Sequence, residues 1–169
     1  ITIHNYGATA PGYLYLASLS FAGVGTPHLL ILENDGTPAF YRAMSASCLD
    51  FKLQPNGQTT YFDQATDKFY AMNGEYAIVD SFVCGNGYPT DVHELQLYPD
   101  GHSLLMSYDP QSVDMSQVVP GGNPNAVVIG LVIQELDQNK DVVFQWRSWD
   151  HFEISDGSVS PLSDLTGPS

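Results

Sequence analysis

Basic residues are scarce in this chain. Its 169 residues include five Lys and Arg against nineteen Asp and Glu, which gives a formal net charge of −14. A chain this acidic is poorly suited to nucleic acid or to an anionic membrane surface, because their phosphates attract Lys and Arg. The balance fits an extracellular protein or one that binds cations. Because the carboxylates are scattered rather than gathered in runs, a solvated surface would also explain them.

Long apolar runs are missing as well. No stretch approaches the roughly 18–20 apolar residues of a transmembrane helix, so we expect no membrane insertion. The sequence opens at Ile1 directly on strand-like residues, without an initiator Met or a signal-type segment, and we expect a processed or trimmed N-terminus. Together with the charge, these features predict a secreted protein, extracellular or periplasmic.

Cysteine is nearly absent, and only Cys48 and Cys84 occur. Neither lies in a motif typical of a nucleophile or of a zinc ligand. The two occupy corresponding ends of neighbouring repeat units, so an oxidising compartment would allow a disulfide between them, and two buried free thiols are the alternative. The chain also has no Asn-x-Ser/Thr site for N-glycosylation.

A helical hydrophobic period is missing too, and strand signals take its place. Aromatic and aliphatic residues alternate with polar ones, and turn dipeptides recur at short intervals. We expect a first strand over residues 12–20 and five hairpins, at 28–42, 49–62, 68–83, 91–107 and 127–149. The length suits one domain with a real core. The sequence therefore predicts an all-β fold.

The hairpins repeat along the chain. Those at 49–62 and 91–107 share a Gln…Pro-x-Gly turn, and their glutamines, Gln54 and Gln96, lie 96 − 54 = 42 residues apart. A repeat of about 40–50 residues with four strands is typical of a β-propeller blade. A β-sandwich is the main rival, but it does not explain the repeat. We expect three to four antiparallel, four-stranded blades.

Residues 109–126 interrupt this repeat and are predicted to be an inserted loop. Such a loop is either a lid over a site or a surface excursion. A propeller usually closes with about four to eight blades, and residues 156–169 look like a loop that leads to a further strand. We therefore expect an incomplete propeller, with residues 1–169 forming a single propeller-type domain or the N-terminal half of one.

The clearest site signal is a polar pair on a core-type row of a strand. Strand alternation places Asp91 and His93 on the same face as Leu95 and Leu97. The corresponding row of the earlier hairpin is apolar throughout, with Leu49, Phe51 and Leu53. Burying a polar group without a hydrogen-bond partner costs roughly 2–7 kcal/mol, so the replacement of apolar residues by Asp91 and His93 needs a reason. We predict a catalytic His93, with Asp91 fixing its tautomer or pairing its charge; a hydrogen-bonded structural histidine is the alternative.

A metal site in the same segment is conceivable but not predicted. Carboxylate and imidazole groups suit several divalent ions, and Asp91, His93 and Glu94 lie close in sequence. Alternation sends Glu94 to the opposite face, where a contact with a neighbouring blade or with backbone is expected. None of the Asp/Asn-Gly turns has the spacing of a dedicated calcium loop. We expect neither metal nor cofactor.

Several of these segments resemble the arylsulfotransferase family of β-propellers. The resemblance lies in Thr90-Asp91-Val92-His93-Glu94-Leu95-Gln96 with Pro99-Asp100-Gly101, in Ile133-Gln134-Glu135-Leu136-Asp137, and in Val143-Phe144-Gln145-Trp146-Arg147-Ser148-Trp149-Asp150-His151-Phe152. Gly12-Tyr13-Leu14 and Leu30-Ile31-Leu32-Glu33-Asn34-Asp35-Gly36 are similar to the family's opening blade. The resemblance covers nearly the whole chain.

The resemblance implies transfer of a sulfuryl group between phenolic compounds without a nucleotide donor, at a site in the central channel of the propeller. The family uses several histidines and an arginine there, and one histidine carries the sulfuryl group. His93 matches the first of these histidines. Such residues suit the chemistry, because a neutral imidazole is a nucleophile and proton shuttle, and a guanidinium stabilises an anionic group in transfer.

Two further residues have weaker expected roles in binding substrate. Arg147 would clamp an anionic group or, as the alternative, form an ion pair with nearby carboxylates. His151 matches a family motif and is either a substrate contact or a structural residue at the rim. The family's next motifs, Asp-x-x-His-x-Asn followed by Ser-Arg and a later His-Asp, are absent from these 169 residues. We expect the chain to be the N-terminal portion of such a transferase.

Two non-catalytic interpretations stay open. One is an extracellular structural module that assembles with itself, because an unclosed propeller exposes strand edges that pair with other chains. The other is a propeller that binds sugars or phenols, which the ten Tyr, eight Phe and two Trp allow. The expected partners are accordingly a phenol or phenolic sulfate, missing propeller blades, or other copies of the chain.

Overall fold

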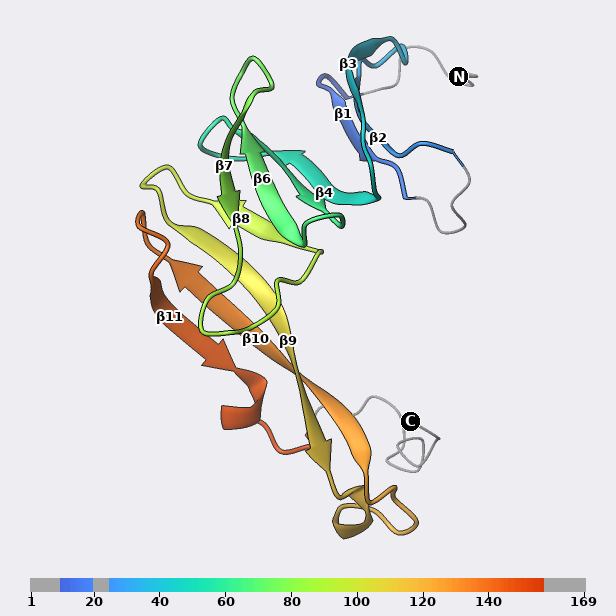
Figure 1. The fold of residues 1–169 in the computed structure, drawn as a ribbon, viewed down its shortest axis with the longest axis vertical. Coiled ribbons are helices and arrows are strands. Elements are labelled where there is room, and N and C mark those ends of the chain that lie inside the picture. The colour runs from blue at the N-terminus through green and yellow to red at the C-terminus, as the bar shows by residue number, and fades with distance from the viewer. Residues whose placement is uncertain (1–9, 20–24, 157–169) are drawn as a thin grey trace. The chain divides into compact units, whose positions relative to one another are not determined.

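The chain folds into β-sheets. The computed structural model describes residues 10–19 and 25–156. These residues form eleven strands and two short 3-10 helices, and the strands make three antiparallel sheets (Figure 1). The all-β prediction is confirmed. Within the described residues the sheets close into neither a barrel nor a propeller, so the arrangement as blades stays a prediction. No helix in this part of the chain is long and apolar enough to cross a bilayer.

The chain divides into two compact units, which are described separately. Unit 1 comprises residues 1–83 and 92–103, and unit 2 comprises residues 84–91 and 104–169. The predicted tail at 156–169 lies outside the described residues except for Asp156.

Unit 1 contains two sheets in which the strands follow chain order. The first sheet has the order β1-β2-β3, with β1 at Leu14–Ala17, β2 at His28–Leu32 and β3 at Pro38–Ala43. The second has the order β4-β5-β6-β7, with β4 at Cys48–Leu53, β5 at Thr59–Asp63, β6 at Lys68–Met72 and β7 at Ile78–Phe82. The first strand is shorter than the predicted 12–20, of which Ser20 lies outside the described residues.

Aromatic side chains form much of the core of unit 1. Strand β5 is buried at all five positions, as expected for a central strand covered on both faces. Tyr15 contacts Phe51 edge to face at 5.4 Å between ring centroids, and Phe62 meets Phe69 at 5.0 Å in the same way. Each buried ring removes a large apolar area from water, and such pairs add roughly 0.5–1.5 kcal/mol. The predicted aromatic alternation thus builds the core.

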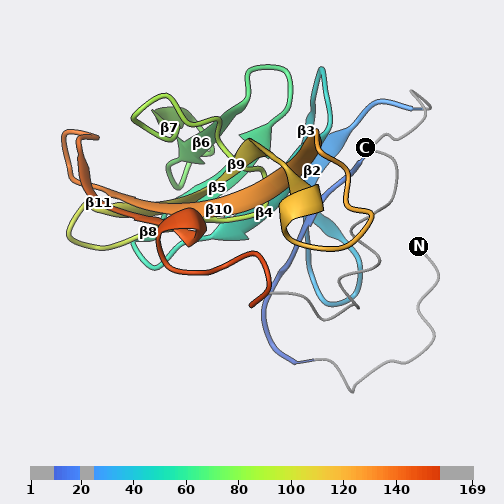
Figure 2. The same cartoon turned by 90° about the horizontal axis from the view of Figure 1, so that it is seen from below.

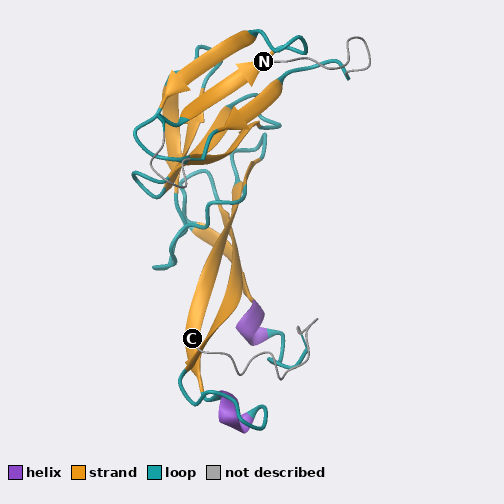
Figure 3. Cartoon of the chain, turned by 90° about the vertical axis from the view of Figure 1, so that its right-hand side faces the viewer, coloured by secondary structure: helices purple, strands orange, loops and turns teal. Residues whose placement is uncertain are grey.

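The third sheet has the order β11-β10-β9-β8. Its strands are β8 at Leu95–Leu97, β9 at Ser103–Val113, β10 at Ala126–Leu136 and β11 at Val142–Arg147, with 3-10 helices η1 at Met115–Gln117 and η2 at Ser148–Asp150. The two long strands β9 and β10 lie side by side in both Figure 1 and Figure 2. Figure 3 shows the two short helices in purple, near these two long strands.

The predicted inserted loop at 109–126 is largely strand. Residues 109–113 continue β9 and Ala126 begins β10, so the connection between them is residues 114–125. That connection is compact, with Met115 and Val119 buried and the Met115 amide bonded to the Asn123 carbonyl at 3.0 Å. The expected strand, which ended at residue 107, was therefore too short.

Pro110 is tolerated within β9 because its missing N–H falls on an open strand edge. The Met106 carbonyl accepts the Asp91 amide at 2.9 Å on one side of β9. Backbone groups alternate sides along a strand, so Pro110, four residues further, faces the same side. No strand lies on that side of residue 110 within the described residues. Such edge positions accept proline without losing a ladder bond.

All five hairpins close with the same turn. The N–H of the first residue donates to the carbonyl four residues on, at 2.8–3.0 Å, and the carbonyl of the first residue accepts the N–H three residues on. These first residues are Glu33, Gln54, Asn73, Tyr98 and Asp137. The fourth residue is left-handed in every case: Gly36, Gly57 and Gly101 with φ of 84°, 84° and 90°, Tyr76 with 58° and Lys140 with 69°. This is the three-residue hairpin loop with a left-handed bulge residue.

The shared turn also corrects the alignment of the repeat. Gln54 and Tyr98 open equivalent turns, 98 − 54 = 44 residues apart. The equivalent positions are therefore those given by the prolines, Pro55 and Pro99, and not by the glutamines, which are 42 apart. The strand parity is the same for both alignments, because both offsets are even.

Lys140 is the turn residue whose replacement by glycine is expected to stabilise the fold. A left-handed conformation strains a residue with a Cβ but not glycine. Since Lys140 is exposed, Lys140→Gly should raise the free energy of unfolding by about 0.5 kcal/mol, after the entropy of glycine in the unfolded chain is subtracted. Gly101→Ala, at the equivalent position, should lower it by about 1 kcal/mol. Urea unfolding of both variants tests the pair, and a loss of equal size in both would contradict the assignment.

Candidate functional site

The predicted catalytic pair lies just before β8 rather than within it. The strand begins at Leu95, and Asp91 to Glu94 have no strand conformation, so alternation cannot be extended back to them. Leu95 and Leu97 are buried as expected. Asp91 is also buried, with 6% of its surface exposed, whereas His93 is exposed. The pair thus differs in accessibility, contrary to the expectation of one shared core-type row.

Asp91 belongs to unit 2, where its segment is tied to β9. Its N–H donates to the Met106 carbonyl at 2.9 Å, and that carbonyl also accepts the Cys84 thiol at 3.3 Å. The Ser107 hydroxyl donates to the Pro89 carbonyl. The backbone that leads toward His93 is therefore held by several bonds to one strand.

His93 belongs to unit 1, where the residues that follow it are held by β4. The β4–β5 ladder shifts register between Leu49 and Lys52, and Asp50 has φ of 47°. A bulge of this kind re-aims a side chain, and the Asp50 carboxylate accepts the Leu95 N–H at 3.0 Å. Burial raises the pKa of Asp50, and its hydrogen bonds with Lys52 and Leu95 act in the opposite direction.

Glu94 is fixed by an ion pair. Lys52 Nζ lies 2.6 Å from Glu94 Oε1 and 2.9 Å from Asp50 Oδ1. Glu94 therefore contacts β4, whereas the sequence led us to expect a contact with a neighbouring blade or with backbone. Because both residues that follow His93 are anchored, the exposed imidazole is presented by a fixed backbone. No group of three or more potential metal ligands exists among the described residues.

The side chain of Gln54 also holds β8. In the sequence, Gln54 served only to align the two hairpins. Its buried amide donates to the Leu95 carbonyl at 2.8 Å and to the Thr60 hydroxyl at 2.7 Å, and accepts the Leu97 N–H at 3.0 Å. A primary amide offers the same donor and acceptor as a peptide group. Gln54 thus takes the place of a neighbouring strand along this edge of β8.

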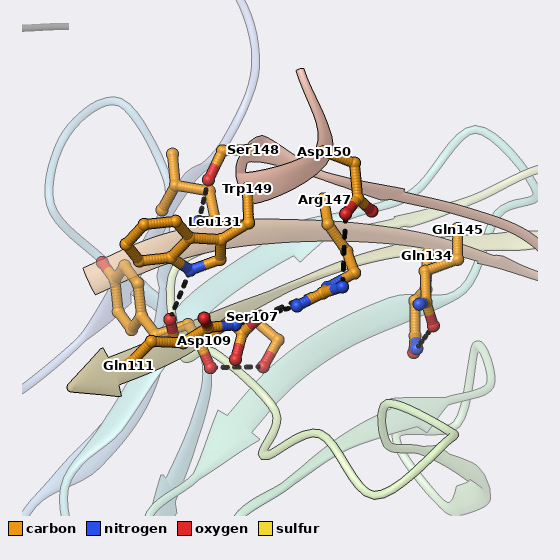
Figure 4. Close-up of polar contacts among 11 residues, drawn as sticks. Ser107, Asp109, Gln111, Leu131, Gln134, Gln145, Arg147, Ser148, Trp149 and Asp150 are labelled. Atoms are coloured by element: carbon orange, nitrogen blue, oxygen red, sulfur yellow. Dashed lines mark hydrogen bonds and ion pairs between the residues drawn. The ribbon is translucent and has the colours of Figure 1, made fainter. Parts of the chain in front are cut away.

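A second buried glutamine does the same in unit 2. Gln134, fully buried in β10, accepts the Gly85 N–H at 2.8 Å and donates to the Gly85 carbonyl at 3.2 Å. Its remaining N–H donates to Gln145 at 2.8 Å (Figure 4). Both glutamines could have been noticed in the sequence as amide side chains at positions where the neighbouring residues predict an apolar core.

Arg147 is held by two carboxylates at the end of β11. Its Nη2 and Nε lie 2.8 and 3.2 Å from Asp109 Oδ2 on β9, and its Nη1 lies 3.3 Å from Asp150 Oδ1 (Figure 4). The hydrogen bond to Asp109 raises the pKa of the guanidinium, against desolvation. This arrangement is the ion pair that the sequence allowed as the alternative to an anion clamp.

Trp149 covers the same part of the sheet. Its Nε1 donates to the Asp109 carbonyl at 2.9 Å, and the Ser148 hydroxyl accepts the Leu131 N–H at 2.8 Å (Figure 4). A Cβ at Gly130 would lie 2.1 Å from the indole nitrogen, so only glycine leaves room for the ring. Helix η2 is thereby fastened across β9 and β10.

His151 contacts a different face of β11 from Arg147. Its exposed ring stacks on Trp146, with 5.3 Å between centroids and 3° between planes, and Phe152 meets Trp146 edge to face at 6.0 Å. Neighbouring strand residues point to opposite faces, so Trp146 and Arg147 diverge. The two residues predicted to bind substrate are therefore not brought together, and His151 packs against Trp146.

Both cysteines are buried free thiols, which was the alternative to a disulfide between them. Burial raises the pKa of Cys48 to about 12 and that of Cys84 to about 11. Thiols with such values form little thiolate near neutral pH and react slowly with electrophiles.

No family model matches the chain, and no curated protein matches it.

Proposed function

We propose that this chain forms part of an arylsulfotransferase-like β-propeller, in which His93 contributes to sulfuryl transfer between phenolic compounds. The observation that carries the proposal is an exposed imidazole on an anchored backbone, within the Thr90–Gln96 motif that resembles the family. Glu94 and Leu95, which follow it, are bonded to Lys52 and Asp50. Such preorganisation is what a group that handles protons during catalysis needs.

The sheets support the finer part of the proposal, that each is a propeller blade. Sheets β4–β7 and β8–β11 each consist of four antiparallel strands that follow chain order. This is the strand arrangement of a blade. Asp50 on β4 and Gln54, directly after β4, bond to the backbone of β8, and β4 and β8 are the first strands of their sheets. We propose that this contact represents the contact between neighbouring blades.

In the proposed reaction His93 acts as a general base. The acceptor phenol gives its proton to the imidazole as its oxygen forms a bond to sulfur, and the bond between sulfur and the donor phenol oxygen breaks. The proton then returns to the departing phenolate, so that atoms and charges balance. We assign no cation to the sulfuryl oxygens from this chain, because Arg147 is already paired with Asp109 and Asp150.

The test is His93→Ala in the full-length protein, with 4-nitrophenyl sulfate as donor and phenol as acceptor. Loss of a general base lowers kcat by roughly 10²–10⁴-fold, and we expect a fall of that order with unchanged thermal stability. His102→Ala is the matched control, because His102 lies in the turn of the same hairpin, directly before β9. Equal turnover by His93→Ala and wild type would remove His93 from the mechanism.

A non-catalytic, self-assembling module is the second candidate. Outer strand β11 exposes the apolar side chains of Val143 and Phe144. Apolar edge strands pair readily with other chains. A folded full-length protein that associates with concentration and transfers no sulfuryl group would favour this candidate.

A further inference from the structure

Among residues 10–19 and 25–156, no strand lies beside one side of β10 along about half of its length. Strand β11 pairs with β10 from Val132, opposite Arg147, to Leu136. The Leu131 N–H already leaves the ladder and donates to the Ser148 hydroxyl. Residues 126–130 extend beyond this point, and the described residues place no strand beside them on that side. This stretch is called the open edge below.

The direction of the backbone groups on the open edge follows from Leu131. Its N–H points toward the side of β11, because Ser148 follows that strand directly. Backbone groups alternate sides along a strand, so those of Ile129 and Val127 point the same way. The groups of Val128 point toward β9, which is hydrogen-bonded to β10. Two residues thus present their N–H and C=O groups for a further strand.

The side chains of the open edge form an uncharged apolar row. Val127, Ile129 and Leu131 are 58%, 62% and 42% exposed, and residues 126–134 contain no charged residue. Natural edge strands usually carry a charge or a proline that blocks pairing. The open side of β9 has such a proline, Pro110, whereas the open edge of β10 has none.

We propose that the open edge binds a second copy of this chain, with β10 pairing antiparallel to β10 about a two-fold axis at Val128. In that register Val127 lies opposite Ile129 of the second copy, so the two residues whose N–H and C=O groups face the open side bond to each other. The apolar row is therefore complementary to itself on one face, as a two-fold interface requires. The pairing needs no complementary charge, which suits a strand without charged residues. This inference is independent of the proposed sulfotransfer.

The charge of the protein sets how the association depends on salt. Two copies with a net charge of −14 each repel one another, and salt screens this repulsion. Because the interface itself contains no ion pair, we expect the dissociation constant to fall as salt increases. An interface formed by ion pairs would weaken instead.

The test is sedimentation of the full-length protein over a range of concentration and salt, together with Ile129→Pro. Proline at 129 removes only an N–H that points to the open side and leaves the ladder with β9 intact. We expect wild type to form dimers and Ile129→Pro to sediment as a monomer at the same concentration. Ile78→Lys is the control, because Ile78 is as exposed but lies on β7; it should not change association.

Amide hydrogen exchange gives a second, residue-specific measurement. The amides of Val127 and Ile129 should become protected as concentration rises, while that of Val128 is protected at every concentration. If Ile129→Pro fails to fold, Val127→Lys replaces it in the sedimentation experiment, with the same expected loss of dimer. A wild type that is monomeric throughout, or a dimer unaffected by Ile129→Pro and Val127→Lys or abolished by Ile78→Lys, would overturn the proposal.

Discussion

Replacing Gln54 by Leu is expected to lower the free energy of unfolding by about 3 kcal/mol. Leucine has a similar volume but cannot bond, so the substitution leaves the Leu95 carbonyl, the Leu97 N–H and the Thr60 hydroxyl without their partner. Each buried group left unpaired costs roughly 1–3 kcal/mol, and relaxation recovers part of the sum. The amides of β8 should also exchange faster with solvent than in wild type.

The control for this variant is Gln96→Leu. Gln96 lies on β8 itself but is exposed, so the same chemical change there should stay within about 0.5 kcal/mol. Urea unfolding with a common slope compares the two variants and wild type. Equal stabilities of Gln54→Leu and Gln96→Leu would show that the buried amide does not hold β8 in place.

Replacing Gly130 by Ala is expected to lower the free energy of unfolding by about 2 kcal/mol. The added methyl group would lie 2.1 Å from Trp149 Nε1, so the indole must move away from β10. Its hydrogen bond to the Asp109 carbonyl would break, and helix η2 would no longer be packed on the sheet. Overpacking at a close contact costs roughly 1–3 kcal/mol, and tryptophan emission should shift to longer wavelength as the ring becomes more exposed.

Gly74→Ala is the matched control, because a Cβ at Gly74 meets nothing within 4 Å. There the methyl group is free of contacts and restricts the unfolded chain, so the effect should be near zero or slightly stabilising. If Gly130→Ala unfolds at the same urea concentration as Gly74→Ala, with unchanged emission, the packing of Trp149 on Gly130 is not as described.

The hairpins could be predicted because their determinants are local. Asn, Asp and Gly at the turns mark the position of each loop, and glycine is the left-handed residue in three of the five. The end of β9 and the start of β8 could not be predicted, since both depend on residues that are near in space but distant in sequence. Pro110 is harmless only because β9 has an open edge there, and β8 begins at Leu95 because Gln54 and Asp50 bond from that residue onward.

The candidate site was predicted in part. The sequence singled out His93 and Asp91 by contrast with an apolar repeat, but it assumed a strand across residues that have no strand conformation. The ion pair between Lys52 and Glu94 joins residues 42 apart in sequence, and alternation within one hairpin carries no information about it. The buried amides were missed for the same reason, because a glutamine's partners appear only when the sheets are assembled.

The most direct test of the proposed function is sulfuryl transfer by the full-length wild-type protein without any nucleotide. The protein would be incubated with 4-nitrophenyl sulfate and phenol, and both products would be identified by mass spectrometry. The proposal predicts phenyl sulfate and nitrophenol in equal amounts, at a rate proportional to enzyme concentration. A folded protein that forms no phenyl sulfate above the level of a heat-denatured sample would contradict it.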